Sequence, residues 1–144
     1  MVLGNYTVSR LVFLAAILAV TSCAQAEISI SSANDVCTVT SEGKSYELQL
    51  TPPCSLVKVD YKDHDYFQYD DSNVFIVAGK PAPLAQLAKW SVTEDDNCSL
   101  QSQAVIVTDE KVQLSVVMHD ALICPDIGLD EKVYRDFFDN MMTK

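Results

Sequence analysis

The sequence predicts a mainly β domain of the α+β class, built from antiparallel hairpins, with a C-terminal amphipathic helix and disulfide staples. Three observations support this fold class. Apolar and polar residues alternate with a period of two through much of the chain. Four cysteines follow an apolar N-terminal leader, and the apolar period changes to that of a helix after Cys124.

The first 26 residues have the pattern of a cleavable signal peptide. Residues 1–10 are largely polar and end in one positive charge, and residues 11–20 are an unbroken apolar run. That run is too short to span about 30 Å of hydrocarbon, which takes about 20 residues. Residues 24–26 (AQA) then give the small-x-small pattern of a signal peptidase site. We therefore expect residues 1–26 to be removed, leaving residues 27–144 as a single mainly β domain.

An alternative processing route depends on Cys23. Residues 20–23 (VTSC) loosely resemble a bacterial lipobox, in which the cysteine is lipidated and becomes the first residue. Either route removes residues 1–22 and predicts a periplasmic or secreted domain. Neither route predicts membrane insertion after signal removal, although the second adds a lipid anchor.

The N-terminal half predicts a hairpin and a third strand. Residues 37–40 and 46–51 alternate as two half-buried strands, joined by a turn at residues 42–44. Pro52 and Pro53 end the second strand, because neither residue can donate a hydrogen bond to a ladder. Alternation over residues 57–61 predicts the third strand.

The middle of the chain predicts a central strand and a short helix. Residues 74–78 (VFIVA) are apolar on both faces, as expected of a strand within the sheet. Leu84, Leu87 and Ala88 have helical spacing, which predicts one or two helical turns within residues 83–90. Residues 95–97 are expected to form a loop.

The C-terminal part predicts a second hairpin and then a helix. Residues 104–108 and 112–117 are the expected strands, with their turn at residues 109–111. Leu129, Val133, Phe137 and Met141 then recur at intervals of four, after early acidic residues that favour a helix N-terminus. We expect an amphipathic helix of about 12 residues that packs on the sheet.

The cysteines left after signal removal are even in number and predict disulfides in an oxidising compartment. They are Cys37, Cys54, Cys98 and Cys124. Four cysteines allow three connectivities, and the hairpin registers favour Cys37–Cys54 and Cys98–Cys124. The second pair is better supported, because both cysteines fall near the open end of one predicted ladder. No C-x-x-C pair is present, which disfavours zinc.

The charge of the domain restricts its partners. The leader holds one of the ten basic residues and none of the twenty acidic ones, so residues 27–144 carry a net charge of −11. Nucleic acid and anionic lipid both require a basic patch, so neither is an expected partner. The charge suits a basic protein partner, or serves solubility alone.

Residues 60–71 (DYKDHDYFQYDD) stand out, with five aspartates, three tyrosines and one phenylalanine. Tyrosine is a large anchor that loses little entropy on binding, and aspartate adds charge complementarity. The predicted binding residues are Tyr61, Asp63, Asp65, Tyr66, Phe67, Tyr69, Asp70 and Asp71. In the alternative interpretation, Tyr61, Tyr66 and Tyr69 face the core and the aspartates are solvated on a hairpin.

Catalytic patterns are weak in this sequence. There is no G-x-S-x-G motif or glycine-rich phosphate loop, and disulfides account for the mature cysteines. His64 lies between two aspartates, and His119 precedes Asp120, but one His-x-Asp spacing is a weak metal or base signal. We expect no catalytic residue, no metal and no cofactor.

These observations together favour an exported, non-enzymatic binding protein of the bacterial envelope. The sharper hypothesis is a periplasmic inhibitor or immunity-type protein that blocks a cationic enzyme acting on the cell wall. Two rivals stay open: a small envelope enzyme or metal-binding protein that uses His64 and its neighbouring aspartates, and a lipid-anchored structural lipoprotein.

Overall fold

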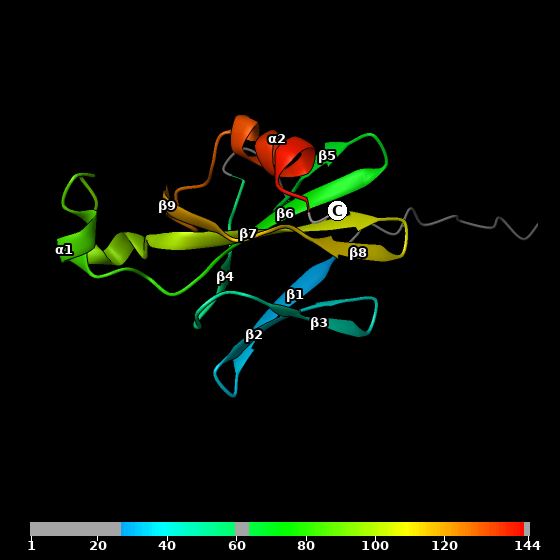
Figure 1. Cartoon of the computed structure of the whole chain (residues 1–144), viewed down its shortest axis with the longest axis horizontal. Helices are drawn as coiled ribbons and strands as arrows, with labels where there is room; N and C mark the ends of the chain where they lie inside the picture. The colour runs from blue at the N-terminus through cyan, green and yellow to red at the C-terminus, as the bar shows by residue number, and fades with distance from the viewer. Residues whose placement is uncertain (1–26, 60–63, 143–144) are drawn as a thin grey trace, which may run out of the picture.

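The computed structural model describes residues 27–59 and 64–142, which form three layers: a small sheet, a larger sheet and a helix (Figure 1). The expected leader, residues 1–26, lies outside the described residues. The smaller sheet, here called sheet A, has the antiparallel order β1-β2-β3. Its strands are β1 (Ile28–Ala33), β2 (Val36–Ser41) and β3 (Lys44–Leu48).

The larger sheet, sheet B, is antiparallel throughout and centred on two strands, β6 and β7. On one side, β4 and β5 both pair with β6, and on the other side β8 and β9 both pair with β7. The strands are β4 (Ser55–Leu56), β5 (Phe67–Tyr69), β6 (Ser72–Ala78), β7 (Ser99–Thr108), β8 (Lys111–Leu114) and β9 (Met118–Ile123).

The apolar run in β6 forms part of two cores. Successive side chains of a strand point to opposite faces. Val74 and Ile76 therefore pack in the cluster that also holds Tyr134 and Phe137 of the helical layer. Phe75 and Val77 pack in the cluster that sheet A covers. The predicted central position of residues 74–78 is confirmed, and the sequence is apolar on both faces because a layer covers each face.

The helices agree closely with the sequence pattern. α2 (Glu131–Asn140) begins at Asp130, whose side chain accepts a hydrogen bond from the Lys132 backbone N–H at 2.8 Å. Its inward side chains Tyr134 and Phe137 are completely buried. The helix has ten residues rather than about 12. α1 (Leu84–Leu87) is the expected short helix, and η1 (Glu94–Asp96) is a 3₁₀ turn where a loop was predicted.

Three predicted strands differ from those in the structure. The strand expected over residues 46–51 is β3, which ends at Leu48, before the two prolines. The prediction of a strand over residues 57–61 is wrong for residues 57–59: the nearest strand, β4, ends at Leu56, although the Val57 N–H still donates to the Ile76 carbonyl at 2.9 Å. Residues 60 and 61 lie outside the described residues. The strand expected over residues 112–117 ends at Leu114, because the Ser115 hydroxyl accepts the Ala104 N–H at 2.8 Å in place of a backbone carbonyl. Strand pairing resumes in β9, which the sequence pattern did not predict.

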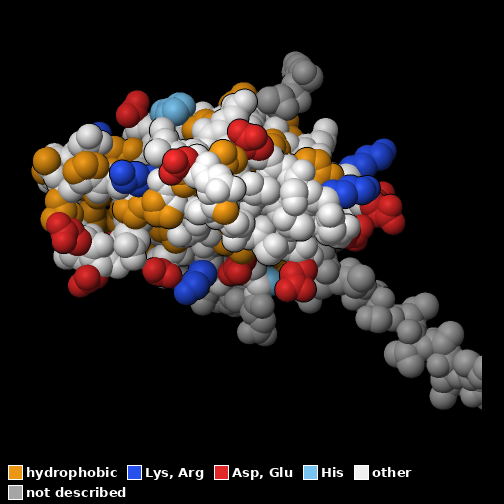
Figure 2. All heavy atoms as spheres, turned by 90° about the horizontal axis from the view of Figure 1, so that it is seen from below, with side chains coloured by type: hydrophobic (Ala, Val, Ile, Leu, Met, Phe, Trp, Pro, Cys, Tyr) orange, Lys and Arg blue, Asp and Glu red, His pale blue; other side chains and the backbone are white. Residues whose placement is uncertain are grey.

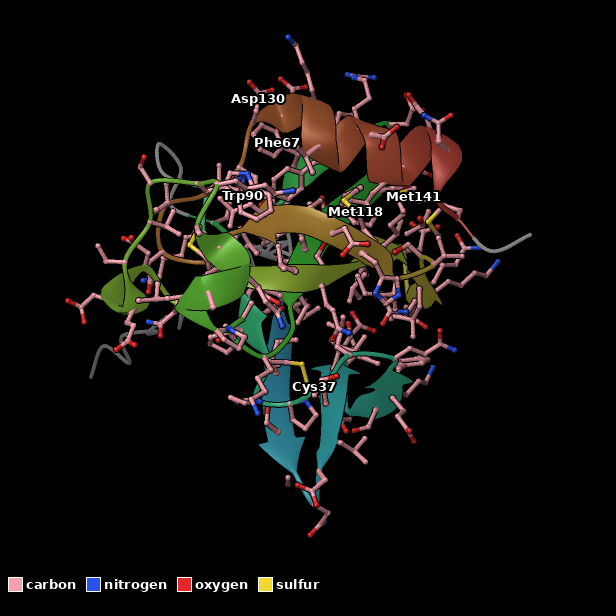
Figure 3. All side chains as sticks on the ribbon, turned by 60° about the vertical axis from the view of Figure 1, so that its left-hand side comes forward. Cys37, Phe67, Trp90, Met118, Asp130 and Met141 are labelled. Carbon is pink, nitrogen blue, oxygen red and sulfur yellow. A yellow bond between two sulfur atoms is a disulfide. The ribbon has the colours of Figure 1, made fainter. Side chains whose placement is uncertain are left out.

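Both favoured cysteine pairings are confirmed. Cys37 bonds to Cys54 and Cys98 bonds to Cys124. Figure 3 shows the first at Cys37, where it ties β2 to the segment that follows β3. The second lies next to the Ser99–Ile123 pair of the β7–β9 ladder, so its partner strand is β9 and not an extension of β8. Two disulfides are compatible with an oxidising compartment outside the cytoplasm.

No helix within residues 27–59 and 64–142 is both long and apolar enough to cross a membrane.

Candidate functional site

The three described aromatic residues of the predicted binding segment are core residues. Tyr66, Phe67 and Tyr69 are 7%, 4% and 7% exposed, respectively. The Phe67 ring lies 4.8 Å from that of Tyr134, and the Tyr66 ring lies 5.2 Å from that of Phe75 (centroid distances). These rings therefore pack in the core, as in the hairpin interpretation of the segment.

The burial of these rings follows from strand geometry. Phe67 and Tyr69 are alternate residues of β5 and face α2, where the Tyr69 hydroxyl donates to the Glu131 carbonyl at 3.1 Å. Tyr66 precedes the strand and faces the sheet A side. Of the other predicted residues, Asp65 is half-buried, and Tyr61 and Asp63 lie outside the described part of the chain. The hairpin interpretation holds for the residues that the structure describes.

What the segment presents to solvent is its turn. Asp70 and Asp71 form a two-residue connection between β5 and β6, because Tyr69 pairs with Ser72. Asp109 and Glu110 form the same kind of connection between β7 and β8, because Thr108 pairs with Lys111. All four acidic residues are exposed.

The two turns lie side by side at one end of sheet B. Ser72 pairs with Thr108 across the β6–β7 ladder, and their hydroxyl oxygens are 2.6 Å apart. We call the four residues Asp70, Asp71, Asp109 and Glu110 the acidic end. Its carboxylates are carried on adjacent, well-paired strands, so their spacing is set by the sheet.

Backbone geometry explains why an acidic residue is found at two of these four positions. The first residue of each turn, Asp70 and Asp109, has a positive φ, 51° and 52° respectively. Aspartate tolerates this left-handed conformation better than most residues, so local structure explains it there. Asp71 and Glu110 are not in that conformation. Their negative charge has no such backbone reason.

No ion pair between described residues involves the carboxylates of the acidic end. Among the described residues, ion pairs join Lys58 to Asp126 at 3.1 Å and Arg135 to Glu131 at 3.6 Å, and neither involves the acidic end. Figure 2 shows acidic side chains at its right-hand edge, the end of the molecule at which both turns lie, with Lys or Arg side chains beside them. This end therefore presents four exposed carboxylates on two turns, with the exposed Lys111 directly after Glu110 in the chain.

The sequence pattern predicts Asp109 and Glu110 only as turn residues. Their proximity to Asp70 depends on the pairing of β6 with β7, which joins residues 36 apart in the chain. The available signal was the pair of adjacent acidic residues in each segment, Asp70-Asp71 and Asp109-Glu110, but it does not indicate that the two pairs are neighbours.

The two histidines, His64 and His119, lie in different surroundings, neither of them at the acidic end. The His64 ring makes an edge contact with the Tyr66 ring, at a centroid distance of 4.1 Å. In the described part of the chain, no three His, Cys, Asp or Glu side chains are grouped so that they could hold a metal ion. His119 and Asp120 line a cleft at the other end of β7.

Comparison of the chain with protein-family models, with curated proteins and with solved structures finds no match. The functional argument therefore depends on the residues themselves.

Proposed function

We propose that this chain is an exported, non-enzymatic binding protein whose acidic end docks on a cationic protein. More specifically, we propose a periplasmic inhibitor or immunity-type protein that occupies the basic cleft of an enzyme acting on the cell wall. The observation that carries the proposal is the acidic end: four exposed carboxylates on two adjacent turns, without an ion pair among the described residues.

The geometry of the acidic end suits such a role. Two-residue turns on paired strands form a narrow, projecting edge, which a concave site can accept with little loss of entropy. Opposite charge on the two partners steers their encounter and orients it, and such steering depends on ionic strength. The net charge of −11 on residues 27–144 adds a long-range attraction for a cationic partner.

The compartment is supported by the disulfides and by the apolar leader of the sequence. Mass spectrometry of the mature N-terminus distinguishes the two processing routes. We propose Glu27 as the first residue; an acylated Cys23 would instead show an anchored lipoprotein.

Reversing charge at the second position of each turn should weaken partner binding. The double variant Asp71→Lys/Glu110→Lys changes charge without requiring a left-handed residue to change. Electrostatic steering accelerates association by about 10- to 1,000-fold, so we expect the association rate with a cationic muramidase to fall at least tenfold at low salt. Surface plasmon resonance at several salt concentrations, with a cationic amidase in parallel, measures this rate.

The matched control makes the same charge change far from the acidic end. Glu94 and Asp95 are exposed residues of η1, whereas Asp96 caps that turn and is left intact. We expect Glu94→Lys/Asp95→Lys to retain most of the association rate. Equal losses in the two double variants would show that net charge and not the acidic end governs binding, and a wild-type domain that binds neither cationic enzyme would refute the inhibitor proposal.

A further inference from the structure

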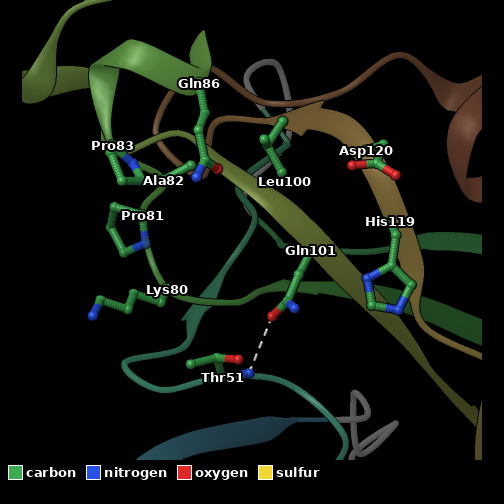
Figure 4. A pocket seen from close by; sticks show the side chains of 10 residues that line it. All are labelled: Thr51, Lys80, Pro81, Ala82, Pro83, Gln86, Leu100, Gln101, His119 and Asp120. Atoms are coloured by element: carbon green, nitrogen blue, oxygen red, sulfur yellow. Dashed lines mark hydrogen bonds between the residues drawn. The ribbon is translucent and has the colours of Figure 1, made fainter.

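A cleft of about 360 Å³ opens near the end of β7 that lies away from the acidic end. Its walls are the segment at residues 80–83, Thr51 in the segment that follows β3, and neighbouring residues of β7 and β9 (Figure 4). Gln101 lies seven residues from Thr108 along β7, roughly 23 Å at about 3.3 Å per residue. The cleft is therefore separate from the acidic end, and its volume is in the lower part of the range of small-ligand sites, about 300–1,000 Å³.

Two glutamines of β7 show why the cleft is suited to a ligand. Gln103 and Gln101 both face sheet A, and their Oε1 atoms accept backbone N–H groups of Gln49 at 2.8 Å and of Thr51 at 3.2 Å. Gln103 is buried, and its Nε2 donates to the Ser115 carbonyl at 2.8 Å. Gln101 has the same anchored oxygen, but its Nε2 has no acceptor among the described residues and borders the cleft.

The orientation of the Gln101 amide is fixed. The Thr51 N–H needs an acceptor, so turning the amide over would oppose two donors. Gly79 packs closely behind it: a Cβ at Gly79 would lie 3.2 Å from Gln101 Oε1 and 3.3 Å from the Thr51 carbonyl oxygen. Gln101 therefore presents a positioned donor to the cleft.

The wall formed by β9 has an unusual backbone. Successive residues of a regular strand point to opposite faces, yet both His119 and Asp120 line the cleft. Asp120 has φ 62°, and the β7–β9 register shifts between Ser99 and Gln101, opposite this residue. Such a bulge re-aims a side chain, and the left-handed conformation at its aspartate is one that this residue type tolerates.

Charged groups lie on opposite sides of the cleft. Figure 4 shows Lys80 on one side, Asp120 on the other, and Gln101 between them. Leu100, Pro81 and Pro83 supply apolar surface. The cleft thus combines Lys80, Asp120 with the neighbouring His119, the amides of Gln101 and Gln86, and small apolar walls, in a domain that is otherwise strongly acidic.

From this arrangement we propose that the cleft binds a short peptide with both termini free. The peptide carboxylate lies toward Lys80, its ammonium toward Asp120, and a peptide carbonyl oxygen accepts a hydrogen bond from Gln101 Nε2. Small side chains such as alanine contact the apolar walls. This binding is independent of the proposed function, because the acidic end contributes no residue to the cleft.

The test uses alanyl-alanine as the probe and isothermal titration calorimetry as the measurement. We expect the wild-type domain to bind alanyl-alanine, and to bind the N-acetylated and the C-amidated forms at least tenfold more weakly. The Asp71→Lys/Glu110→Lys variant should bind the probe as the wild type does, which separates failure of this inference from failure of the proposed function.

Substitutions in the cleft assign each contact. Gln101→Glu retains the oxygen that accepts the Thr51 N–H but removes the donor, so affinity should fall at least tenfold with the melting temperature unchanged. Gln113→Glu, on an exposed position of β8, is the control with the same charge change. In Asp120→Asn, asparagine adopts the left-handed backbone as readily as aspartate does. We expect this variant to bind alanyl-alanine and its N-acetylated form equally well, because the carboxylate that faces the free amino group is gone.

Three results would overturn this inference. They are absence of measurable binding of alanyl-alanine at millimolar concentration, equal binding of the blocked and free peptides, and an unchanged affinity in Gln101→Glu.

Discussion

Replacing Phe67 with alanine is expected to lower the free energy of unfolding by about 3–5 kcal/mol, the usual cost of removing a buried phenylalanine ring. Phe67 is 4% exposed and packs within the cluster between sheet B and α2, with its ring centroid 4.8 Å from that of Tyr134. The loss combines the transfer free energy of the ring with the cavity that it leaves. Urea denaturation monitored by circular dichroism measures the change.

A neighbouring substitution provides the control. Asp70→Asn keeps the left-handed turn, because asparagine also adopts positive φ readily, and it removes only an exposed charge. We expect its free energy of unfolding to stay within about 0.5 kcal/mol of the wild-type value. If Phe67→Ala cost less than about 1 kcal/mol and still abolished partner binding, Phe67 would be an interface residue and its packing against Tyr134 would be unimportant.

This result determines how binding assays on the segment are designed. Loss of partner capture in a Tyr66 or Phe67 variant would report unfolding as much as lost contact, since both rings are buried. Variants confined to Asp71 and Glu110 avoid this ambiguity, because both side chains are exposed and their turns need no left-handed residue at those positions.

Several elements were predictable because their signals are local. The apolar pattern of α2 and the hairpin of β2 and β3 depend on residues close in sequence, and so do the turns that join strands. β1 was missed because serines occupy three of its six positions, and only Ile28 and Ile30 face inward as large apolar residues. β9 was missed because Asp120 interrupts its pairing, so its residues do not alternate regularly.

The candidate site was less predictable than the fold. The pattern of residues 66–69 is the same for a strand edge and for an exposed aromatic loop, and only the position of α2 above β5 distinguishes them. The acidic end depends on the Ser72–Thr108 pair, and the cleft on a bulge in β9 and on contact between Gln101 and Thr51. These are long-range contacts, which one sequence without tertiary information does not determine.

Removing the Cys98–Cys124 disulfide should have an effect of similar size on stability. The cross-link joins residues 26 apart, for which the chain-entropy model gives about 3–4 kcal/mol. The core at this end is small: Cys98 and Cys124 are themselves buried there with Leu87, and the β7–β9 ladder ends at the adjacent Ser99–Ile123 pair. We expect Cys98→Ala/Cys124→Ala to lower the free energy of unfolding by that amount in urea denaturation.

The location of the lost stability within the domain distinguishes the two disulfides better than the total loss does. For Cys37→Ala/Cys54→Ala, whose cysteines are 17 residues apart, the same model gives about 3 kcal/mol, so the two variants differ little in total. Hydrogen exchange should distinguish them: β9 and α1 lose protection when Cys98–Cys124 is removed, and β2 and β3 lose it when Cys37–Cys54 is removed.

The same variants should differ in ligand binding. Because His119 and Asp120 belong to β9, the variant without Cys98–Cys124 should no longer bind alanyl-alanine but should still bind the cationic partner. Uniform loss of protection across both sheets would show instead that the disulfides stabilise the domain as a whole and do not hold the cleft.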